Sequence, residues 1–271
     1  MSIKILLLTI LFVLNLWAQE RVVSLSPSIT EIVYALGKGD SLVATSSYSL
    51  YPKEAQKLPI IGGYENPHIE KILTQKPTLV VGQKFNAFAV NKLKHFAVKT
   101  LTLDLTSIDS IKKSIALLAQ ELHSTKGAKL IQNIEDALAD APKAKTPKKV
   151  LIVYGLRVDL RSGIYIAGQH IFFNEIINEC GNTNAYTSNS TSQPVLNYEN
   201  VIALNPDIII VLHSHATESS VDVVEALASW QAIPTNASKN KTIHIIDENY
   251  LHIPSHRIAL TIKKLCETMN D

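Results

Sequence analysis

The chain has 271 residues, 46% of them hydrophobic, with 26 Lys and Arg against 24 Asp and Glu, a formal net charge of +2. This near-neutral balance lacks the concentrated positive charge that binding to nucleic acid or to an acidic membrane surface requires. The length suits one large domain or two lobes of ordinary size.

Residues 1–19 have the pattern of a secretory signal peptide: a short basic start, an apolar run over 5–16, and a small residue, Ala18, before polar residues. The apolar run is shorter than the ~20 residues of a membrane span. A retained anchor is the alternative. No cysteine lies near the expected cleavage site, which argues against a lipoprotein. We therefore predict an exported chain that begins near residue 20.

Strands and helices alternate through the first half of the chain, and the strands are nearly continuous apolar runs. This pattern is typical of a parallel sheet covered by helices. A capping box at Ser28 and Glu31 and the glycine at Gly37 support the first helix. The expected elements are strand 21–25, helix 26–37, extended segments 42–46 and 59–63, helix 67–76, strand 78–82, helix 86–95, strand 99–104 and helix 107–122.

Residues 124–141 keep apolar side chains at helical spacing for more than four turns. A helix of this length spans ~27 Å at about 1.5 Å per residue, enough to join two compact lobes. One more covering helix is the alternative. The second half then repeats the alternation, with strand 150–155, helices 170–180 and 198–204, strand 207–212, helix 219–230, strand 242–247 and helix 255–268.

The expected fold is therefore α/β, with two α/β lobes that contain parallel sheets and are joined by a single long backbone helix. The predicted organisation is a signal peptide at 1–19, an N-terminal lobe at 20–122, a connecting helix and linker at 123–147, and a C-terminal lobe at 148–271.

One short unit occurs twice, as "PHIEKILTQKPTLVV" at 67–81 and "NYENVIALNPDIIIV" at 197–211. In both, a glutamate (Glu70 or Glu199) opens a helix, and a proline precedes a β-branched strand. A carboxylate in the first helical turn ordinarily complements the helix dipole. A repeat in each lobe also predicts a pair of acidic groups that arginines of a two-fold symmetric partner could bind.

Several aromatic and polar side chains follow predicted strands, where ligands of open α/β sheets bind. A tyrosine offers a flat apolar face and one hydroxyl, which suits a large and partly polar organic ligand, although ordinary loop tyrosines are the alternative. The residues are Tyr48, Tyr51, Tyr64, Gln83, Tyr154 and Tyr250.

His213, His215 and His252 also follow strands and are candidate metal ligands. No carboxylate or cysteine joins them at ligand spacing, so contact with a metal held in an organic chelate is the stronger of the two metal hypotheses. Catalytic signatures such as G-x-S-x-G and H-E-x-x-H are missing from the sequence. These observations favour a binding protein; a bare nickel, cobalt or zinc binder and a secreted metal-dependent hydrolase are the alternatives.

Cys180 and Cys266 are the two cysteines of the chain. An exported protein meets an oxidising compartment, so an even pair predicts one disulfide. Two buried free thiols are the alternative, because sequence alone does not supply the geometry.

Five segments together resemble the periplasmic binding proteins of ABC importers for vitamin B12, haem and iron–siderophore complexes. They are "RVVSLSPSITEIVYALG", "LVATSSYSLYPKEAQKLPIIGG", "GQHIFFNEIINECG", "VIALNPDIIIV" and "SHRIALTIKKLC". The resemblance implies periplasmic localisation, two lobes bridged by one helix, and a metal chelate bound in a cleft between them. It further implies that the protein catalyses no reaction and requires no cofactor. Glu70 and Glu199 would dock on a permease dimer with ATPase subunits, and the protein would contact the membrane only through that permease. The resemblance also implies a disulfide between Cys180 and Cys266.

The resemblance also implies a ligand set. Members that bind vitamin B12 have several tryptophans in the ligand cradle, and this chain departs from them: Tyr64, Gln83, Gln193 and Tyr250 stand where tryptophans are expected. Tyr48, Tyr154 and Arg257 align with cleft positions. Fewer aromatic rings and more amides predict a more polar ligand or a differently shaped corrinoid. Cobalamin, haem and a ferric siderophore are all open as the chelate.

Overall fold

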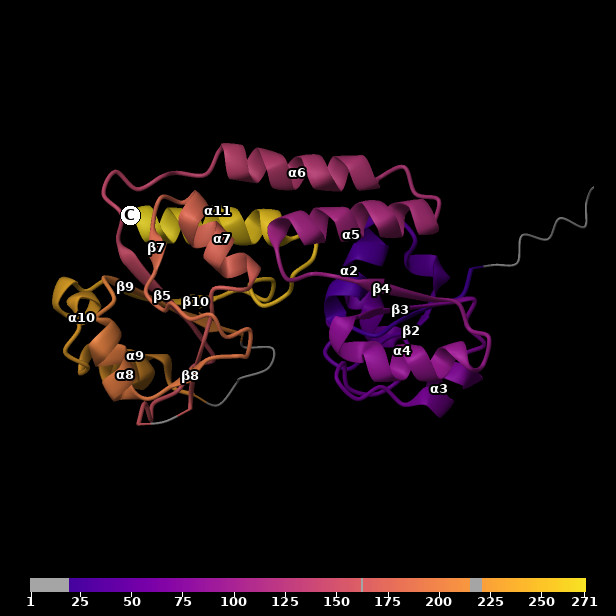
Figure 1. The fold of residues 1–271 in the computed structure, drawn as a ribbon, viewed down its shortest axis with the longest axis horizontal. Coiled ribbons are helices and arrows are strands. Elements are labelled where there is room, and N and C mark those ends of the chain that lie inside the picture. Colours follow the sequence, from indigo (N-terminus) through magenta and orange to yellow (C-terminus); the bar gives the residue numbers. More distant parts are fainter. Residues whose placement is uncertain (1–19, 162, 215–220) are drawn as a thin grey trace, which may run out of the picture. The chain divides into compact units, whose positions relative to one another are not determined.

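The computed structural model describes residues 20–161, 163–214 and 221–271 (Figure 1). The predicted signal peptide at 1–19, His215 and the first two residues of the helix expected at 219–230 lie outside the described residues. Contacts divide the chain into two compact units, with the division between Leu103 and Asp104. This division groups the segment 107–122 with the second unit, whereas the sequence pattern predicts it in the first lobe; the lobe boundaries stay a prediction.

The first unit contains a four-stranded parallel sheet in the order β2-β1-β3-β4. Its elements are β1 Val22–Ser24, α2 Pro27–Ala35, η1 Gly39–Ser41, β2 Leu42–Ala44, η2 Lys53–Lys57, α3 Ile69–Thr74, β3 Leu79–Gln83, η3 Lys84–Asn86, α4 Ala87–Lys94 and β4 Thr100–Leu103. The segment expected to be extended at 59–63 forms only isolated bridges, which pair Ile60 with Thr45 and Gly62 with Pro67.

Local chemistry accounts for the ends of α2 and for the packing of the sheet. The Ser26 hydroxyl accepts a hydrogen bond from the backbone N–H of Ile29, at 3.3 Å, and Pro27 opens the helix. Gly37 follows with a φ of 73°, which favours glycine. Apolar residues of α3, α4 and three strands form one buried cluster, and Figure 1 shows α2 on the other side of the sheet.

The second unit contains a six-stranded sheet in which β10-β9-β5-β6-β8 form a path and β7 pairs with β5. Its elements are α5 Ile108–Glu121, α6 Gly127–Ala139, β5 Lys149–Tyr154, β6 Ile164–Ile166, α7 Phe172–Glu179, β7 Thr183–Asn184, β8 Val195–Leu196, α8 Tyr198–Leu204, β9 Ile208–His213, α9 Val223–Gln231, α10 Asn236–Asn240, β10 Ile243–Asp247 and α11 Ile258–Asn270.

The second sheet is rich in parallel pairs but is not wholly parallel, which corrects the expectation. β5, β7, β9 and β10 run parallel, whereas β6 pairs antiparallel with both β5 and β8. The reason is the connection from β5 to β6, in which nine residues return the chain to the neighbouring strand without the helical crossover that a parallel pair needs.

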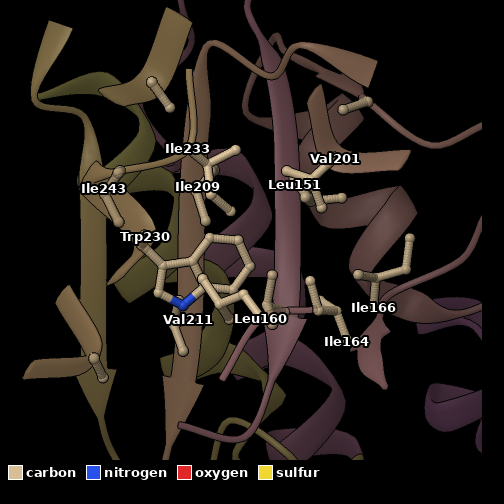
Figure 2. Close-up of a cluster of buried hydrophobic side chains, with 14 of the residues drawn as sticks. Leu151, Leu160, Ile164, Ile166, Val201, Ile209, Val211, Trp230, Ile233 and Ile243 are labelled. Atoms are coloured by element: carbon tan, nitrogen blue, oxygen red, sulfur yellow. The ribbon is translucent and has the colours of Figure 1, made fainter. Parts of the chain in front are cut away.

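The main core of the second unit lies between this sheet and the helices α8 and α9 (Figure 2). Trp230 on α9 is fully buried there beside Val211 and Leu160. Its indole Nε1 has no hydrogen-bond partner among the described residues. Figure 1 shows α7 and α11 on the opposite side of the sheet.

The helix predicted at 124–141 is α6, which spans 13 residues and contacts α5 and α11 within the second unit. That α6 connects two lobes stays a prediction. Cys180, which ends α7, forms a disulfide with Cys266 of α11, and both residues are fully buried. No helix in the described part of the chain is both long and apolar enough to cross a membrane.

Candidate functional site

The first unit brings two predicted ligand residues to the carboxyl ends of its strands. Gln83 ends β3, and Tyr48 follows β2 in the loop 45–51. β1 lies between β2 and β3, so the strands that follow β1 in the chain are added on opposite sides of it. Ligands of open α/β sheets bind at such a point, where the strand order reverses. The Gln83 Nε2 donates to Ser26 Oγ at 2.8 Å, which joins the ends of β1 and β3 across this point.

Exposed aromatic side chains lie in the loops at this edge of the first sheet. Tyr48 is 64% exposed, although it holds a φ of 64° that few non-glycine residues adopt. The Tyr64 and Phe85 rings meet edge to face with centroids 5.6 Å apart. Burial, with a smaller effect of Glu65, raises the pKa of Tyr64 above its ordinary value, so its hydroxyl is protonated at neutral pH.

A buried network of hydroxyl groups supports the loop that carries Tyr48. The Thr30 hydroxyl of α2 lies 2.5 Å from Thr45 Oγ1 and 2.9 Å from Ser24 Oγ. Thr45 Oγ1 in turn donates to Ser49 Oγ at 2.8 Å, and all four residues are buried. Such satisfied polar networks rigidify the backbone that they join. The loop is therefore tied to α2 on both sides of Tyr48.

The second unit brings Tyr154, His213, Tyr250 and His252 to the carboxyl ends of β5, β9 and β10. The Tyr154 ring lies 5.8 Å from the rings of both His252 and Phe173. Burial raises the pKa of Tyr154 well above its ordinary range, so this hydroxyl is a neutral group in an apolar setting. His213 is buried, and its strand position pairs with Asp247 of β10.

Arg257 is the one predicted ligand residue that carries a positive charge, and it is only 7% exposed. Its Nη1 donates to Asn249 Oδ1 at 2.7 Å, and its guanidinium carbon lies 5.7 Å from the centroid of the Tyr250 ring. A buried guanidinium next to an aromatic face is suited to a carboxylate or carbonyl oxygen of a ligand.

Gln193 and the histidines fit the expectations less closely. Gln193 lies just before β8, two strands from Tyr154, and its Nε2 donates to the carbonyl oxygen of Ile166 at 2.6 Å. Over residues 20–161, 163–214 and 221–271, no three His, Cys, Asp or Glu side chains come together as a site for a metal ion. A metal role for His213 and His252 stays a prediction.

The two glutamates of the repeated unit occupy matching positions. Glu70 lies in the first turn of α3, the helix that precedes β3, and Glu199 lies in the first turn of α8, the helix that precedes β9. Both are exposed. Asn197 caps α8 by accepting from the Asn200 N–H at 2.8 Å, and its Nδ2 lies 3.4 Å from Glu199 Oε2.

His256, beside Arg257, gives the second unit an acid-sensitive group. Its Nδ1 is buried without a hydrogen-bond partner among the described residues, and burial, assisted by Arg257, lowers its pKa to about 4. In the unfolded chain a histidine has a pKa of about 6.5. Between these values the unfolded state binds more protons, so the free energy of unfolding falls as the pH drops from 6.5 to 4.

We expect the free energy of unfolding of the native protein to fall by about 3 kcal/mol between pH 6.5 and 4, and the His256→Gln variant to lack this fall. Urea unfolding at pH 7.5, 6.0 and 4.5 measures the effect as a difference between variant and native protein. His170→Gln changes an exposed histidine of the same unit and serves as the matched control. Equal pH dependence of the native and His256→Gln proteins would contradict the assignment.

The residues that hold the proposed site in place were not among those predicted from the sequence. Thr30 and Phe173 lie inside helices, and the others follow strands but are not of the residue types that drew attention there, or lie in a helical segment: Ser26, Thr45, Phe85, Asn86 and Asn249. The buried hydroxyls at Ser26 and Thr30 belong to the segment "SPSIT", in which the sequence predicted a helix start but no side-chain network.

Residues 22–250 match the family described as periplasmic binding protein. A vitamin B12-binding protein of Yersinia pestis (strain Pestoides F) is 30% identical over 270 residues, which cover 97% of this chain and 91% of the relative. The structure is similar to a periplasmic haem-binding protein from Roseiflexus sp. RS-1, with a TM-score of 0.76, 26% identity, and 93% and 98% of the two chains covered.

A periplasmic vitamin B12-binding protein of Vibrio cholerae is also similar, with a TM-score of 0.73, 25% identity, and 92% and 96% of the two chains covered. These matches define the class of protein: a binding protein and not an enzyme. The chain belongs to the periplasmic binding protein family. The resemblance found in the sequence is thus confirmed at the level of the family.

Proposed function

We propose that this protein is the periplasmic substrate-binding protein of an ABC importer and that it captures a metal chelate: cobalamin, haem or a ferric siderophore. The observation that carries the proposal is the family match over residues 22–250. Relatives named for vitamin B12 and for haem support the ligand class, because both compounds hold their metal in a large, rigid macrocycle.

The side chains at the strand ends have the chemistry that such a ligand needs. Tyr48, Tyr64 and Phe85 offer exposed aromatic faces for a flat macrocycle. Arg257 offers a buried positive charge for a peripheral carboxylate or amide oxygen. A rigid ligand and a preformed site keep the entropic cost of binding small. The proposed contacts from both units are Tyr48, Tyr64, Gln83, Tyr154, Gln193, Tyr250 and Arg257.

In this proposal the protein catalyses no reaction, because ATP hydrolysis in its partner subunits drives transport. Glu70 and Glu199 would bind arginines of a permease dimer, so that one receptor meets two equivalent surfaces. A signal peptide at residues 1–19 would deliver the chain to the periplasm.

The purified protein is expected to bind at least one of haemin, cyanocobalamin and a ferric hydroxamate siderophore, with a dissociation constant of about 1 μM or lower. Absorbance titration follows haemin, and isothermal calorimetry follows the other two. Tyr64→Ala and Tyr250→Ala should each weaken binding about tenfold, because a lost aromatic contact costs roughly 1.5 kcal/mol.

Phe96→Ala is the matched control. Phe96 is also exposed, but it lies between α4 and β4, at the amino end of β4 and away from the strand ends that carry the site. Unchanged affinity in the tyrosine variants would contradict the proposed contacts. Binding of bare nickel, cobalt or zinc ions in preference to all three chelates would contradict the ligand class, and turnover of an ester or peptide substrate would contradict a pure binding role.

A further inference from the structure

The side chain of Asn86 bonds to two separate backbone segments of the first-unit site. Its Nδ2 donates to the carbonyl oxygen of Tyr64 at 2.5 Å, and its Oδ1 accepts from the backbone N–H of Gln83 at 2.9 Å. A backbone N–H can only donate and a carbonyl can only accept, so both partners fix the same orientation of the amide. Asn86 is 1% exposed, which makes both bonds costly to lose.

These two bonds act on the side chains that are proposed to touch the ligand. Tyr64 belongs to the loop between β2 and α3, whereas Gln83 ends β3. The Gln83 side chain is held by Ser26, and the Tyr64 ring meets that of Phe85, the neighbour of Asn86. The Asn86 amide therefore sets the position of the Tyr64 loop relative to the end of β3.

Gly82 leaves room for the side-chain amide of Asn86. A Cβ added at Gly82 would lie 3.2 Å from both Cβ and Oδ1 of Asn86 and 3.1 Å from a methyl group of Leu25. These contacts are tighter than most side chains in folded proteins show, so a larger residue at 82 would displace the Asn86 side chain. The close packing of Gly82 against Asn86 is a second sign that the amide has a defined position.

We infer that Asn86 is a positioning residue for ligand binding, which fixes Tyr64 and Gln83 in one arrangement before the ligand arrives. The inference rests on the proposed function, because Tyr64 and Gln83 are proposed ligand contacts. Its physical basis is preorganisation: a loop that is already ordered loses less entropy when it closes on a ligand.

Asn86→Asp separates the two bonds. A carboxylate keeps the acceptor for the Gln83 N–H but loses the donor to Tyr64, so only the Tyr64 loop is released. Two amides report on that loop: Ser47 donates to Gly62 O at 2.8 Å, and His68 donates to Ile61 O at 2.7 Å. We expect their hydrogen exchange to accelerate about tenfold, while the Gln83 amide keeps its protection.

The affinity for haemin, cyanocobalamin or the ferric hydroxamate siderophore, whichever the native protein binds, is expected to fall about tenfold in Asn86→Asp. The same substitution in a Tyr64→Ala background should change the affinity little. Asn91→Asp controls for the added charge, because Asn91 is exposed and lies in α4. If Asn86→Asp does not fold, Asn86→Ala replaces it and should accelerate exchange at Gln83 as well.

The inference would be overturned if Asn86→Asp lowered the affinity equally in the native and the Tyr64→Ala backgrounds. Unchanged hydrogen exchange at the Ser47 and His68 amides would also overturn it. If the native protein binds none of these three probes, the proposed ligand class fails, whereas the exchange rates still decide whether Asn86 holds the loop.

Discussion

Reversal of two exposed charges, Glu70→Arg together with Glu199→Arg, is expected to abolish uptake while ligand affinity stays unchanged. Both acids lie in the first turn of short helices that precede parallel strands, and both are exposed. The loss of one interfacial charge pair costs about 2–5 kcal/mol, so losing both should weaken docking at least about a thousandfold. Cells that depend on this receptor for uptake of the bound probe provide the measurement.

A variant with the same change in net charge separates docking from general electrostatics. Glu54→Arg with Asp136→Arg places one reversal in each unit, at exposed acids outside the repeated unit. This protein should support normal uptake. Normal uptake by the Glu70→Arg and Glu199→Arg protein would disprove the docking role, and a loss of ligand affinity in it would show that the acids serve the ligand site instead.

Replacement of both cysteines, Cys180→Ala with Cys266→Ala, is expected to destabilise the second unit by about 2–5 kcal/mol. The disulfide joins residues 86 positions apart, and a long loop restricts the unfolded chain strongly. Alanine is preferred to serine because both positions are fully buried and a hydroxyl there would need a partner. Thermal unfolding should show a midpoint lowered by roughly 5–15 °C.

Reductant supplies the control within the same experiment. It should lower the midpoint of the native protein towards that of the double alanine variant and leave the variant itself unchanged. A variant as stable as the oxidised native protein would contradict a stabilising role for the bond. The effect should be confined to the second unit, because α7 and α11 both belong to it.

The elements that the sequence predicted well are those with long, periodic apolar patterns. β5 and β9 were expected within a residue of their observed bounds, and α8 was placed correctly. The pairing of Cys180 with Cys266 is also confirmed, and two cysteines left one choice of partner. The short strands β6, β7 and β8 and the short helix α10 were missed, because two to five residues carry too little periodicity.

The site was predictable only in part, for a related reason. A strand-end tyrosine is visible in a sequence, since its type and its place both point to a ligand. Asn86 and Thr30 act through hydrogen bonds to segments far along the chain, and no local pattern encodes those partners. Tyr64 and Tyr154 could therefore be proposed from their places after strands, and Arg257 only from the family resemblance, whereas the contacts that hold these residues could not be predicted.

The buried indole of Trp230 also gives this protein an internal optical probe. Trp230 is the one tryptophan of the described residues, and it lies in the apolar core under the second sheet. Indole emission shifts towards longer wavelength when water reaches the ring, so the emission wavelength of Trp230 reports whether the second unit is folded. Residues 20–103 contain tyrosines and no tryptophan, so within the described part of the chain tryptophan emission follows the unfolding of the second unit alone.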